Sequence, residues 1–481
     1  MSITRRELIK AAGIGVAGAV VGGVGGIALN SGPGWLLGSE LPRALPVDTD
    51  TDIPAEADVV VVGAGIAGIS TALFLQQKGL KTVVFEKGRV AGEQSSRAFG
   101  WVYTNGWHPE KLELAVLSKQ IWQDFAGQHG IDVGWRQSGN TFFLKNEQEV
   151  AQAQAWIDEA RRRFPDDIDA RLLRGAELEA FYPGAAANGY IAAQHQPSDG
   201  TGEPAWSVPL MASAARAAGV KIIAPVAVRG IETQGGQVSH VVTERGVVRA
   251  SRVVVAGGAW SRLFAGNLGV KLPQLGIASP LQRLSAVNGL PGGGAGTDFA
   301  WRRHADGEYT LGVQRHIAPV TLDSFKLMLD FLPALRHTGD LLKVRFGRDF
   351  FESLRLPTRW RNDEVTPFEQ VRMLTARVPR KEADEFLANA ERAVPAFGQA
   401  RVLERWGGVI DATPDSTPVI SEVPALPGLF LNTGFSGGGF TLGTGAGRML
   451  AEIIAGEQPS ADPSIYRFSR FSDGSELSLR H

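Results

Sequence analysis

The chain has 481 residues, more than one compact domain usually holds, so we expect two or three domains. Its 49 Lys and Arg residues nearly balance its 50 Asp and Glu residues, giving a formal net charge of −1. That balance provides no basic surface for nucleic acid. Cysteine is absent, which excludes disulfides, Cys-based zinc or iron–sulfur sites, a thiol nucleophile and a cofactor linked through cysteine.

Residues 1–30 have the pattern of an export signal. Arg5 and Arg6 precede an uncharged, glycine-rich run over 11–29, as in a twin-arginine signal. The run is nearly as long as the ~20 apolar residues that cross a bilayer, and no A-x-A cleavage site follows it. We therefore favour an uncleaved anchor over a removed peptide, which implies the periplasmic face of a bacterial inner membrane. Residues 31–56 contain four prolines and are predicted to be a linker.

From Ala57 the sequence has the pattern of a dinucleotide-binding unit. A β-branched run at 58–62, typical of a strand buried on both faces, precedes the glycine-rich turn 63–68 and an apolar helical pattern. The glycines allow a tight turn, close approach of the backbone to a pyrophosphate, and close packing of helix on strand. A second strand, 82–85, is followed directly by Glu86, at a position where an acidic residue can bind a ribose hydroxyl. The sequence predicts an adenine dinucleotide site.

Four later motifs favour FAD over NAD. They are AGEQSSR at 91–97, ASRVVVAGGAWS at 250–261, WGGVIDATPD at 406–415 and GFSGGGFTLGTGAG at 434–447. Together with the first turn, they resemble the FAD-dependent amino-acid oxidase and dehydrogenase family, which includes glycine oxidase, sarcosine oxidase and D-amino-acid dehydrogenase. The resemblance covers most of the chain from Ala57 to about Tyr466. In that family the last motif brings backbone amides against the flavin ring, where they can stabilise negative charge.

The start of the chain and the motifs GEQSSR, VVVAGGAWSRLF, PFEQ and PVISEV look more specifically like the membrane-bound bacterial L-amino-acid deaminases. This resemblance implies oxidation of an amino acid to a 2-oxo acid and ammonia. It also implies contact with membrane lipid and transfer of the electrons to a quinone or another respiratory-chain acceptor. The alternatives are a D-amino-acid dehydrogenase, an enzyme similar to glycine or sarcosine oxidase, and, more remotely, a non-catalytic carrier of the same fold. Substrate chirality and oligomeric state stay open.

The resemblance also implies an α/β fold class. A discontinuous, Rossmann-like FAD-binding domain of the glutathione-reductase type would comprise residues 57–105, 195–265 and 398–466. Residues 106–194 and 266–397 would form a substrate-binding domain built on an antiparallel sheet. Within it, about 322–367 resembles an additional module of the deaminases. Its apolar residues, Leu329 and Phe331 among them, have helical spacing, which fits either ordinary packing or a surface that meets the bilayer.

FAD is expected to bind non-covalently, because the loop after the second strand offers no His for attachment. The motifs and the resemblance together give the expected cofactor-binding residues. These are Gly63, Gly65, Ile66, Ala67, Gly68, Glu86, Lys87, Glu93, Gln94, Ser95, Ser96, Arg97, Val226, Gly257, Gly434, Gly437, Gly438, Gly439, Phe440 and Thr441.

Oxidation of an amino acid at a flavin depends mainly on holding the substrate so that its Cα–H faces the ring. A bidentate Arg is the natural holder of the substrate carboxylate, and the resemblance assigns this catalytic role to Arg315. It also places Trp101, Ile317 and Gly438 at the substrate pocket, where relatives carry other residue types, so the side-chain preference is left open. The histidines have no metal-ligand spacing, and no metal site is expected.

Overall fold

The computed structural model describes residues 44–290, 292–296, 299–312, 316–338, 342–374, 376 and 380–480. The expected export segment and Arg315 lie outside these residues. Among them, no helix is both long and apolar enough to cross a membrane.

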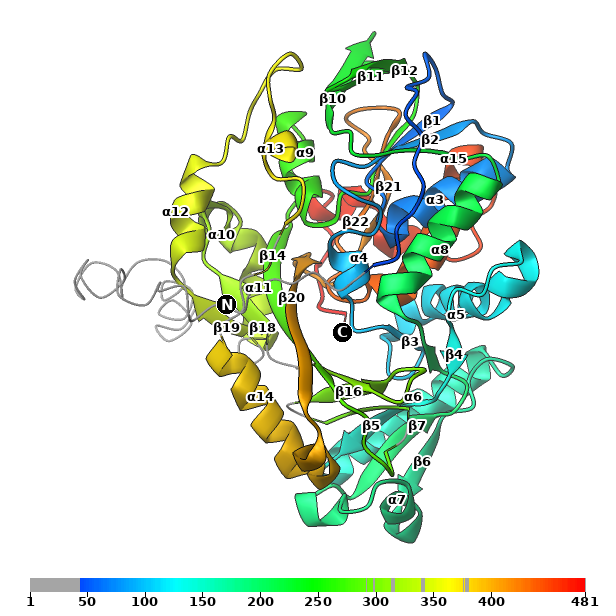
Figure 1. The fold of residues 1–481 in the computed structure, drawn as a ribbon, viewed down its shortest axis with the longest axis vertical. Helices are drawn as coiled ribbons and strands as arrows, with labels where there is room; N and C mark the ends of the chain where they lie inside the picture. The colour runs from blue at the N-terminus through cyan, green and yellow to red at the C-terminus, as the bar shows by residue number, and fades with distance from the viewer. Residues whose placement is uncertain are drawn as a thin grey trace, which may run out of the picture.

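A six-stranded sheet forms the upper half of the molecule in Figure 1, in the order β21-β22-β13-β1-β2-β9. Its strands are β1 (Val59–Val62), β2 (Thr82–Phe85), β9 (Lys221–Ile223), β13 (Val253–Val255), β21 (Val419–Glu422) and β22 (Leu429–Thr433). All neighbours pair in parallel except β21 with β22. The three chain segments 57–105, 195–265 and 398–466 therefore meet in one sheet.

Both faces of this sheet are covered, because successive valines of β1 point to opposite sides. Val59 and Val61 pack with the helices, whereas Val60 packs with the core on the other face. The first face carries α3 (Ile66–Gln77), α5 (Pro109–His129), α8 (Pro204–Ala217) and α15 (Gly439–Ala455). The second carries α9 (Ser261–Asn267) and the antiparallel strands β10 (Val228–Gln234), β11 (Gln237–Thr243) and β12 (Gly246–Arg249).

A ten-stranded, mostly antiparallel sheet forms the lower half. Its order is β19-β18-β14-β17-β16-β15-β5-β7-β6, and β20 pairs with β14. The strands are β5 (Asn140–Leu144), β6 (Arg171–Arg174), β7 (Ala192–Gln196), β14 (Leu275–Leu284), β15 (Gly293–Ala295), β16 (Ala300–Arg303), β17 (Tyr309–Gly312), β18 (His316–Pro319), β19 (Leu342–Arg345) and β20 (Val402–Ala412). The helices α6 (Glu147–Arg163), α7 (Gly175–Phe181) and α14 (Arg380–Ala393) belong to this half.

Smaller elements join the halves. They are α4 (Gln94–Arg97), the three strands β3 (Trp101–Val102), β4 (Arg136–Gln137) and β8 (Gly200–Thr201), and α13 (Pro367–Gln370). The long pair β14–β20 also spans both halves, pairing without interruption from Leu275–Ala412 to Arg283–Glu404. The expected mixed fold, with one mainly parallel and one mainly antiparallel sheet, is confirmed.

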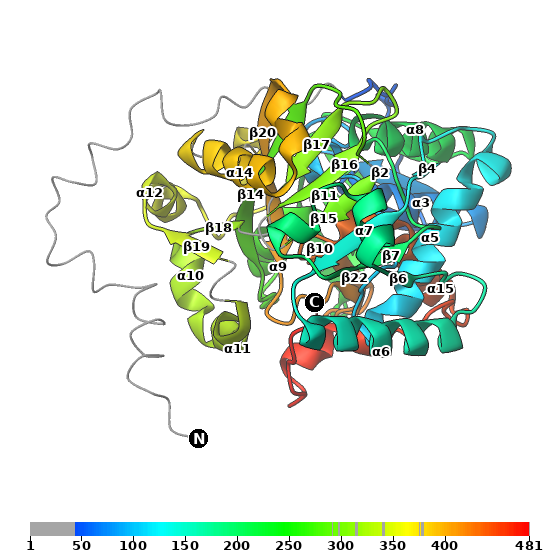
Figure 2. The same cartoon turned by 90° about the horizontal axis from the view of Figure 1, so that it is seen from below.

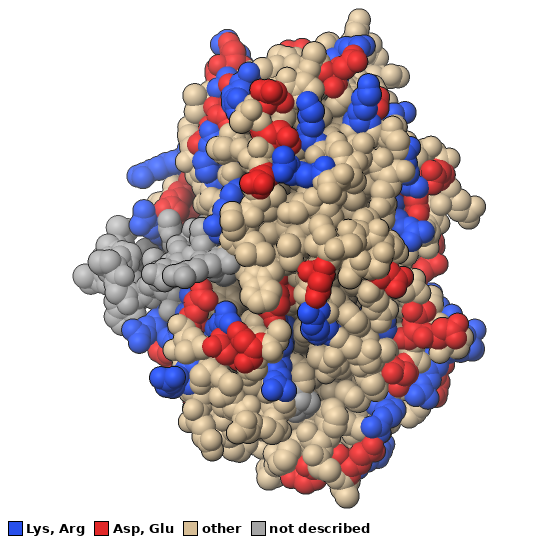
Figure 3. Space-filling model, turned by 45° about the vertical axis from the view of Figure 1, so that its right-hand side comes forward, with Lys and Arg blue, Asp and Glu red and all other residues tan. Residues whose placement is uncertain are grey.

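The segment 322–355 forms a separate cluster of short elements at one edge of the molecule. It contains α10 (Leu322–Lys326), α11 (Met328–Thr338), β19 and α12 (Arg348–Arg355). Figure 2 shows this cluster at the left edge, away from α3 and α8. An ion pair of 2.8 Å between Asp323 and Arg262 attaches α10 to α9. Elsewhere, acidic and basic side chains are interspersed over the face drawn in Figure 3, in keeping with the net charge.

Candidate active site

A cavity opens at the carboxyl ends of the parallel strands β1, β2, β13 and β22. This edge is where open α/β sheets bind their ligands. Its walls come from segments far apart in the chain, because β14 and β20 bring the lower sheet up against the upper one. The lining includes the first glycine turn, α4, the segment after β13, the end of β20 and the start of α15.

At one end of the cavity the backbone is too close-packed for side chains. Gly63 has a φ of +107°, and a Cβ atom on it would lie 2.6 Å from the carbonyl oxygen of Ala256. A Cβ atom on Gly68 would lie 2.0 Å from the carbonyl oxygen of Gly63. The hydroxyl of Ser95 accepts a hydrogen bond of 2.9 Å from the amide of Ile66, at the start of α3. This arrangement leaves bare backbone at a helix N-terminus, as a pyrophosphate requires.

Glu86 lies in the cavity lining at the end of β2. Its two carboxylate oxygens accept hydrogen bonds from the amides of Ala64, at 3.0 Å, and Gly88, at 2.7 Å. Burial raises the pKa of Glu86, although these bonds and Lys87 oppose the effect. The carboxylate is thus fixed beside the glycine turn, where a ribose hydroxyl would meet it.

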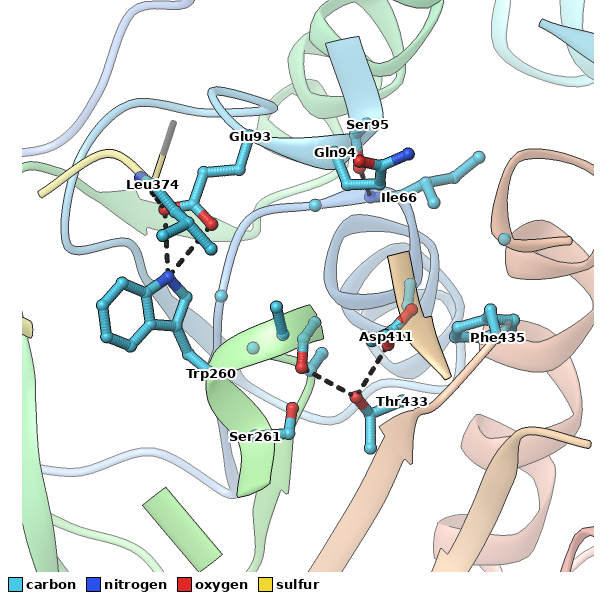
Figure 4. A pocket seen from close by; sticks show the side chains of 18 of the residues that line it. Ile66, Glu93, Gln94, Ser95, Trp260, Ser261, Leu374, Asp411, Thr433 and Phe435 are labelled. Atoms are coloured by element: carbon cyan, nitrogen blue, oxygen red, sulfur yellow. Dashed lines mark hydrogen bonds between the residues drawn. The ribbon is translucent and has the colours of Figure 1, made fainter. Parts of the chain in front are cut away.

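The carboxylate of Glu93 organises the opposite wall (Figure 4). It binds the ammonium of Lys87 at 2.6 Å, the indole N–H of Trp260 at 3.1 Å and the amide of Leu374 at 2.8 Å. Lys87 also donates to the carbonyl of Arg372, at 2.9 Å. The charge of Lys87 is therefore used to attach segment 371–374 to the cavity wall.

A second buried carboxylate, Asp411 on β20, lies where the two sheets meet. It accepts hydrogen bonds from the amide of Gly434 at 2.7 Å, from the hydroxyl of Thr433 at 3.2 Å and from the amide group of Gln274 at 3.2 Å. Burial raises the pKa of Asp411. Since Gly434 begins the glycine-rich turn before α15, this contact fixes the turn relative to the ten-stranded sheet.

Arg97, at the end of α4, contributes a buried cation to the lining. Its side chain is 2 % exposed, and one terminal nitrogen donates to the carbonyl of Leu374 at 2.5 Å. The other terminal nitrogen, Nη2, is buried and has no hydrogen-bond partner among the described residues. Burial lowers the pKa of Arg97, partly offset by Glu93, yet a guanidinium stays charged in proteins.

Fourteen of the residues expected to bind FAD line this cavity. They are Gly63, Gly65, Ile66, Ala67, Glu86, Lys87, Glu93, Gln94, Ser95, Arg97, Gly257, Gly437, Gly439 and Phe440. The cavity lining does not include Gly68, Ser96, Val226, Gly434, Gly438 and Thr441. Val226 adjoins it, because its amide donates to the carbonyl of Glu86 at 2.7 Å. The hydroxyl of Thr441 donates instead to the carbonyl of Trp101, at 2.9 Å.

The expected substrate-pocket residues lie outside the described cavity lining. Trp101 packs edge-on against Phe99 and Phe142, with ring centroids 4.8 and 6.0 Å apart. Ile317 on β18 is buried in a small apolar cluster with Ala278. A Cβ atom on Gly438 would lie 2.5 Å from the ring of Trp107, so that indole fills the space a larger residue at 438 would need.

Several lining residues escaped the sequence analysis. Trp260, Asp411 and Thr433 each lie in or beside a quoted motif, so the motifs held a signal for them. Leu374 had none, because its contacts with the lining residues Glu93 and Arg97 join positions 281 and 277 residues apart in the chain.

The sequence profile described as FAD dependent oxidoreductase matches residues 58–453. The chain belongs to this family. The resemblance drawn from its motifs is thereby confirmed, and FAD is its cofactor. The cavity fits that cofactor, because it combines a close-packed glycine turn, the fixed carboxylate of Glu86 and a second glycine turn at α15. FAD, when bound, supplies the capacity to accept two electrons as a hydride.

Solved structures with a similar chain include L-amino acid deaminases. That of Proteus myxofaciens, in complex with anthranilate, is 38 % identical with a TM-score of 0.86, and the match covers 90 % of this chain and 97 % of the other. That of Proteus vulgaris is 35 % identical with a TM-score of 0.83, covering 89 % and 100 %.

Curated relatives are more distant. Glycine oxidase of Pseudomonas aeruginosa is 26 % identical over 85 % of this chain and 97 % of its own length. Mitochondrial sarcosine dehydrogenase of Mus musculus is 26 % identical over 89 % of this chain, but the match spans only 42 % of that longer protein.

Proposed function

We propose that the protein oxidises an amino acid to a 2-oxo acid and ammonia. The observation that carries this proposal is the 38 % identity to the P. myxofaciens deaminase over 97 % of that chain, together with a cavity fit for FAD. Glycine and sarcosine enzymes are similar over as much of this chain, but at 24–26 % identity.

The reaction balances as two steps. With FAD bound as the hydride acceptor, the neutral amine form of the substrate would give up a hydride from Cα and become an iminium. Water then adds to the iminium carbon and the C–N bond breaks, which releases the 2-oxo acid and ammonium. The protein must hold the substrate carboxylate, exclude bulk water during hydride transfer and offer the Cα–H to the ring. We assign the first task to Arg315, as the resemblance implies.

Two electrons must then leave FAD, and we propose that a quinone or another membrane acceptor takes them with two protons. Segment 322–355 supports this view, because it carries apolar side chains on its surface. Leu329 is 79 % exposed, and Val344, Phe346, Phe351 and Leu354 are exposed as well. Phe331, by contrast, is 8 % exposed and packs inward. Five exposed apolar side chains in one short segment suit contact with lipid or with a membrane partner.

Anaerobic mixing of the FAD-loaded protein with single amino acids tests the proposal. A substrate should bleach the visible absorbance of FAD, and the products should be a 2-oxo acid and ammonia in equal amounts. The L and D enantiomers of each amino acid, glycine and sarcosine form the panel. Bleaching by sarcosine with release of formaldehyde, and by no primary amino acid, would replace the proposal with the N-methylamine alternative.

A further inference from the structure

Arg97 is a buried charge without a carboxylate partner in the described structure. Among the described residues, no ion pair within 4.0 Å involves it, whereas Lys87, the other cation of the described lining, binds Glu93 at 2.6 Å. An unpaired buried charge is costly, so its presence requires compensation. Within the part of the chain that the structure describes, the one hydrogen bond that its side chain donates goes to a backbone carbonyl, which is neutral.

The position of Arg97 indicates which part of the cavity its charge serves. Two residues before it, Ser95 contacts the amide of Ile66 in the first glycine-rich turn, which is expected to bind the pyrophosphate. The backbone of Arg97 lies beside β20, because its carbonyl accepts a hydrogen bond of 3.2 Å from the indole of Trp406, while its guanidinium extends to the carbonyl of Leu374. Three residues further along β20, Val409 enters the cavity lining, followed by Ile410 and Asp411. This is the end of the cavity that also receives the glycine turn of α15.

We propose that Arg97 supplies the positive charge that stabilises the cofactor ring when a hydride makes that ring anionic. A hydride carries two electrons and one proton, so a neutral oxidised ring gains one negative charge in the transfer. A buried guanidinium with a free N–H in the cavity lining would favour the anion and raise the reduction potential of the bound FAD. The inference rests on FAD as the cofactor and does not depend on which substrate is oxidised.

Arg97→Gln removes the charge but keeps a donor for the carbonyl of Leu374, and Arg97→Lys keeps the charge. Arg372→Gln is the matched control, since Arg372 belongs to the same wall segment but pairs with Glu244 at 2.6 Å and does not line the cavity. The full-length, FAD-loaded proteins are reduced enzymatically beside a reference dye, without any amino acid present. Anthranilate binding is measured separately as a probe for carboxylate recognition.

Arg97→Gln should shift the equilibrium with the dye about tenfold toward oxidised FAD, which is about 30 mV for a two-electron couple. Arg97→Lys should recover most of this shift, and Arg372→Gln should show none. An unchanged potential in Arg97→Gln overturns the proposal. So does loss of FAD from that variant, because Arg97 would then hold the cofactor, and so does a weakened affinity for anthranilate at unchanged potential, because Arg97 would then hold a carboxylate. Each of these results leaves the proposed deaminase reaction itself standing.

Discussion

The carboxylate of Asp411 on β20 and the hydroxyl of Thr433 at the end of β22 are joined by a hydrogen bond of 3.2 Å (Figure 4). One strand belongs to the lower, ten-stranded sheet and the other to the upper, six-stranded sheet. The same carboxylate binds the amide of Gly434, so a single buried group sets the distance between the glycine-rich turn and the lower sheet.

Asp411→Ala should therefore destabilise the protein and loosen FAD. Three buried donors lose their acceptor, and the expected loss in the free energy of unfolding is about 2–3 kcal/mol. Urea unfolding followed by FAD fluorescence measures both effects. Asp132→Ala, which removes an exposed carboxylate, is the control and should change little. Equal unfolding curves for the two variants would contradict the role given to Asp411.

Gly68→Ala should abolish FAD binding. The added methyl group would lie 2.0 Å from a backbone oxygen, so the first turn must move away from the position that receives the pyrophosphate. Gly127→Ala is a matched control, because that glycine also lies in a helix and its Cβ would meet nothing within 4 Å. FAD content after gel filtration distinguishes them. Full FAD content in Gly68→Ala would show that the turn does not hold the cofactor.

Arg315→Ala should raise the apparent KM strongly and lower kcat, because the substrate carboxylate loses its partner and the Cα–H its alignment. The expected cost in kcat/KM is on the order of 3 kcal/mol. Arg315→Lys should recover activity only in part, since an ammonium lacks the bidentate geometry. Rapid-mixing measurement of flavin reduction tests both variants. Reduction of Arg315→Ala with wild-type kinetics would place the carboxylate site elsewhere.

Replacing exposed apolar residues of segment 322–355 with charged ones should weaken the association of the protein with membranes. Phe351→Asp combined with Leu354→Asp changes two exposed side chains of α12, whereas the buried Phe331 must be left intact. Val247→Asp, on the exposed side of β12, is the control. Flotation with vesicles and quinone-linked activity are the measurements, made on preparations of equal FAD content. Unchanged flotation would assign the apolar surface another partner.

Acid should destabilise the protein through His195. Burial, together with the charge of Arg171, lowers the pKa of His195 to about 4, against about 6.5 in the unfolded chain. The unfolded chain thus binds a proton first as the pH falls, so stability is full above about pH 6.5 and is lost toward pH 4, by about 3 kcal/mol. His195→Asn should remove this part of the pH dependence of the melting temperature, and the more exposed His240→Asn should not.

The local parts of the site were predictable from sequence, and its long-range contacts were not. The strand, glycine turn, helix and Glu86 follow one another within 58–86, so the local sequence pattern was enough to predict their arrangement. Glu93 shows the opposite case. A motif indicated the residue, but its partners Trp260 and Leu374 come from distant segments whose approach depends on the packing of both sheets.

The sequence pattern also did not predict which apolar side chains of segment 322–355 are exposed to solvent. Leu329 and Phe331 are both apolar and lie two positions apart, yet one points to solvent and the other inward. Two residues along a helix are about 200° apart around its axis, so only the packing partner decides which is buried. The same limit applied to Trp101, whose aromatic neighbours come partly from β5.

The cavity is built from both ends of the described chain, since Gly63 and Gly437 are 374 positions apart and both line it. During synthesis, the first glycine-rich turn is therefore made early. The cavity can be completed only after the start of α15 has been made. FAD cannot guide the first folding steps, because most of its walls do not yet exist. We therefore expect FAD to bind late, once the distant segments that line the cavity have come together.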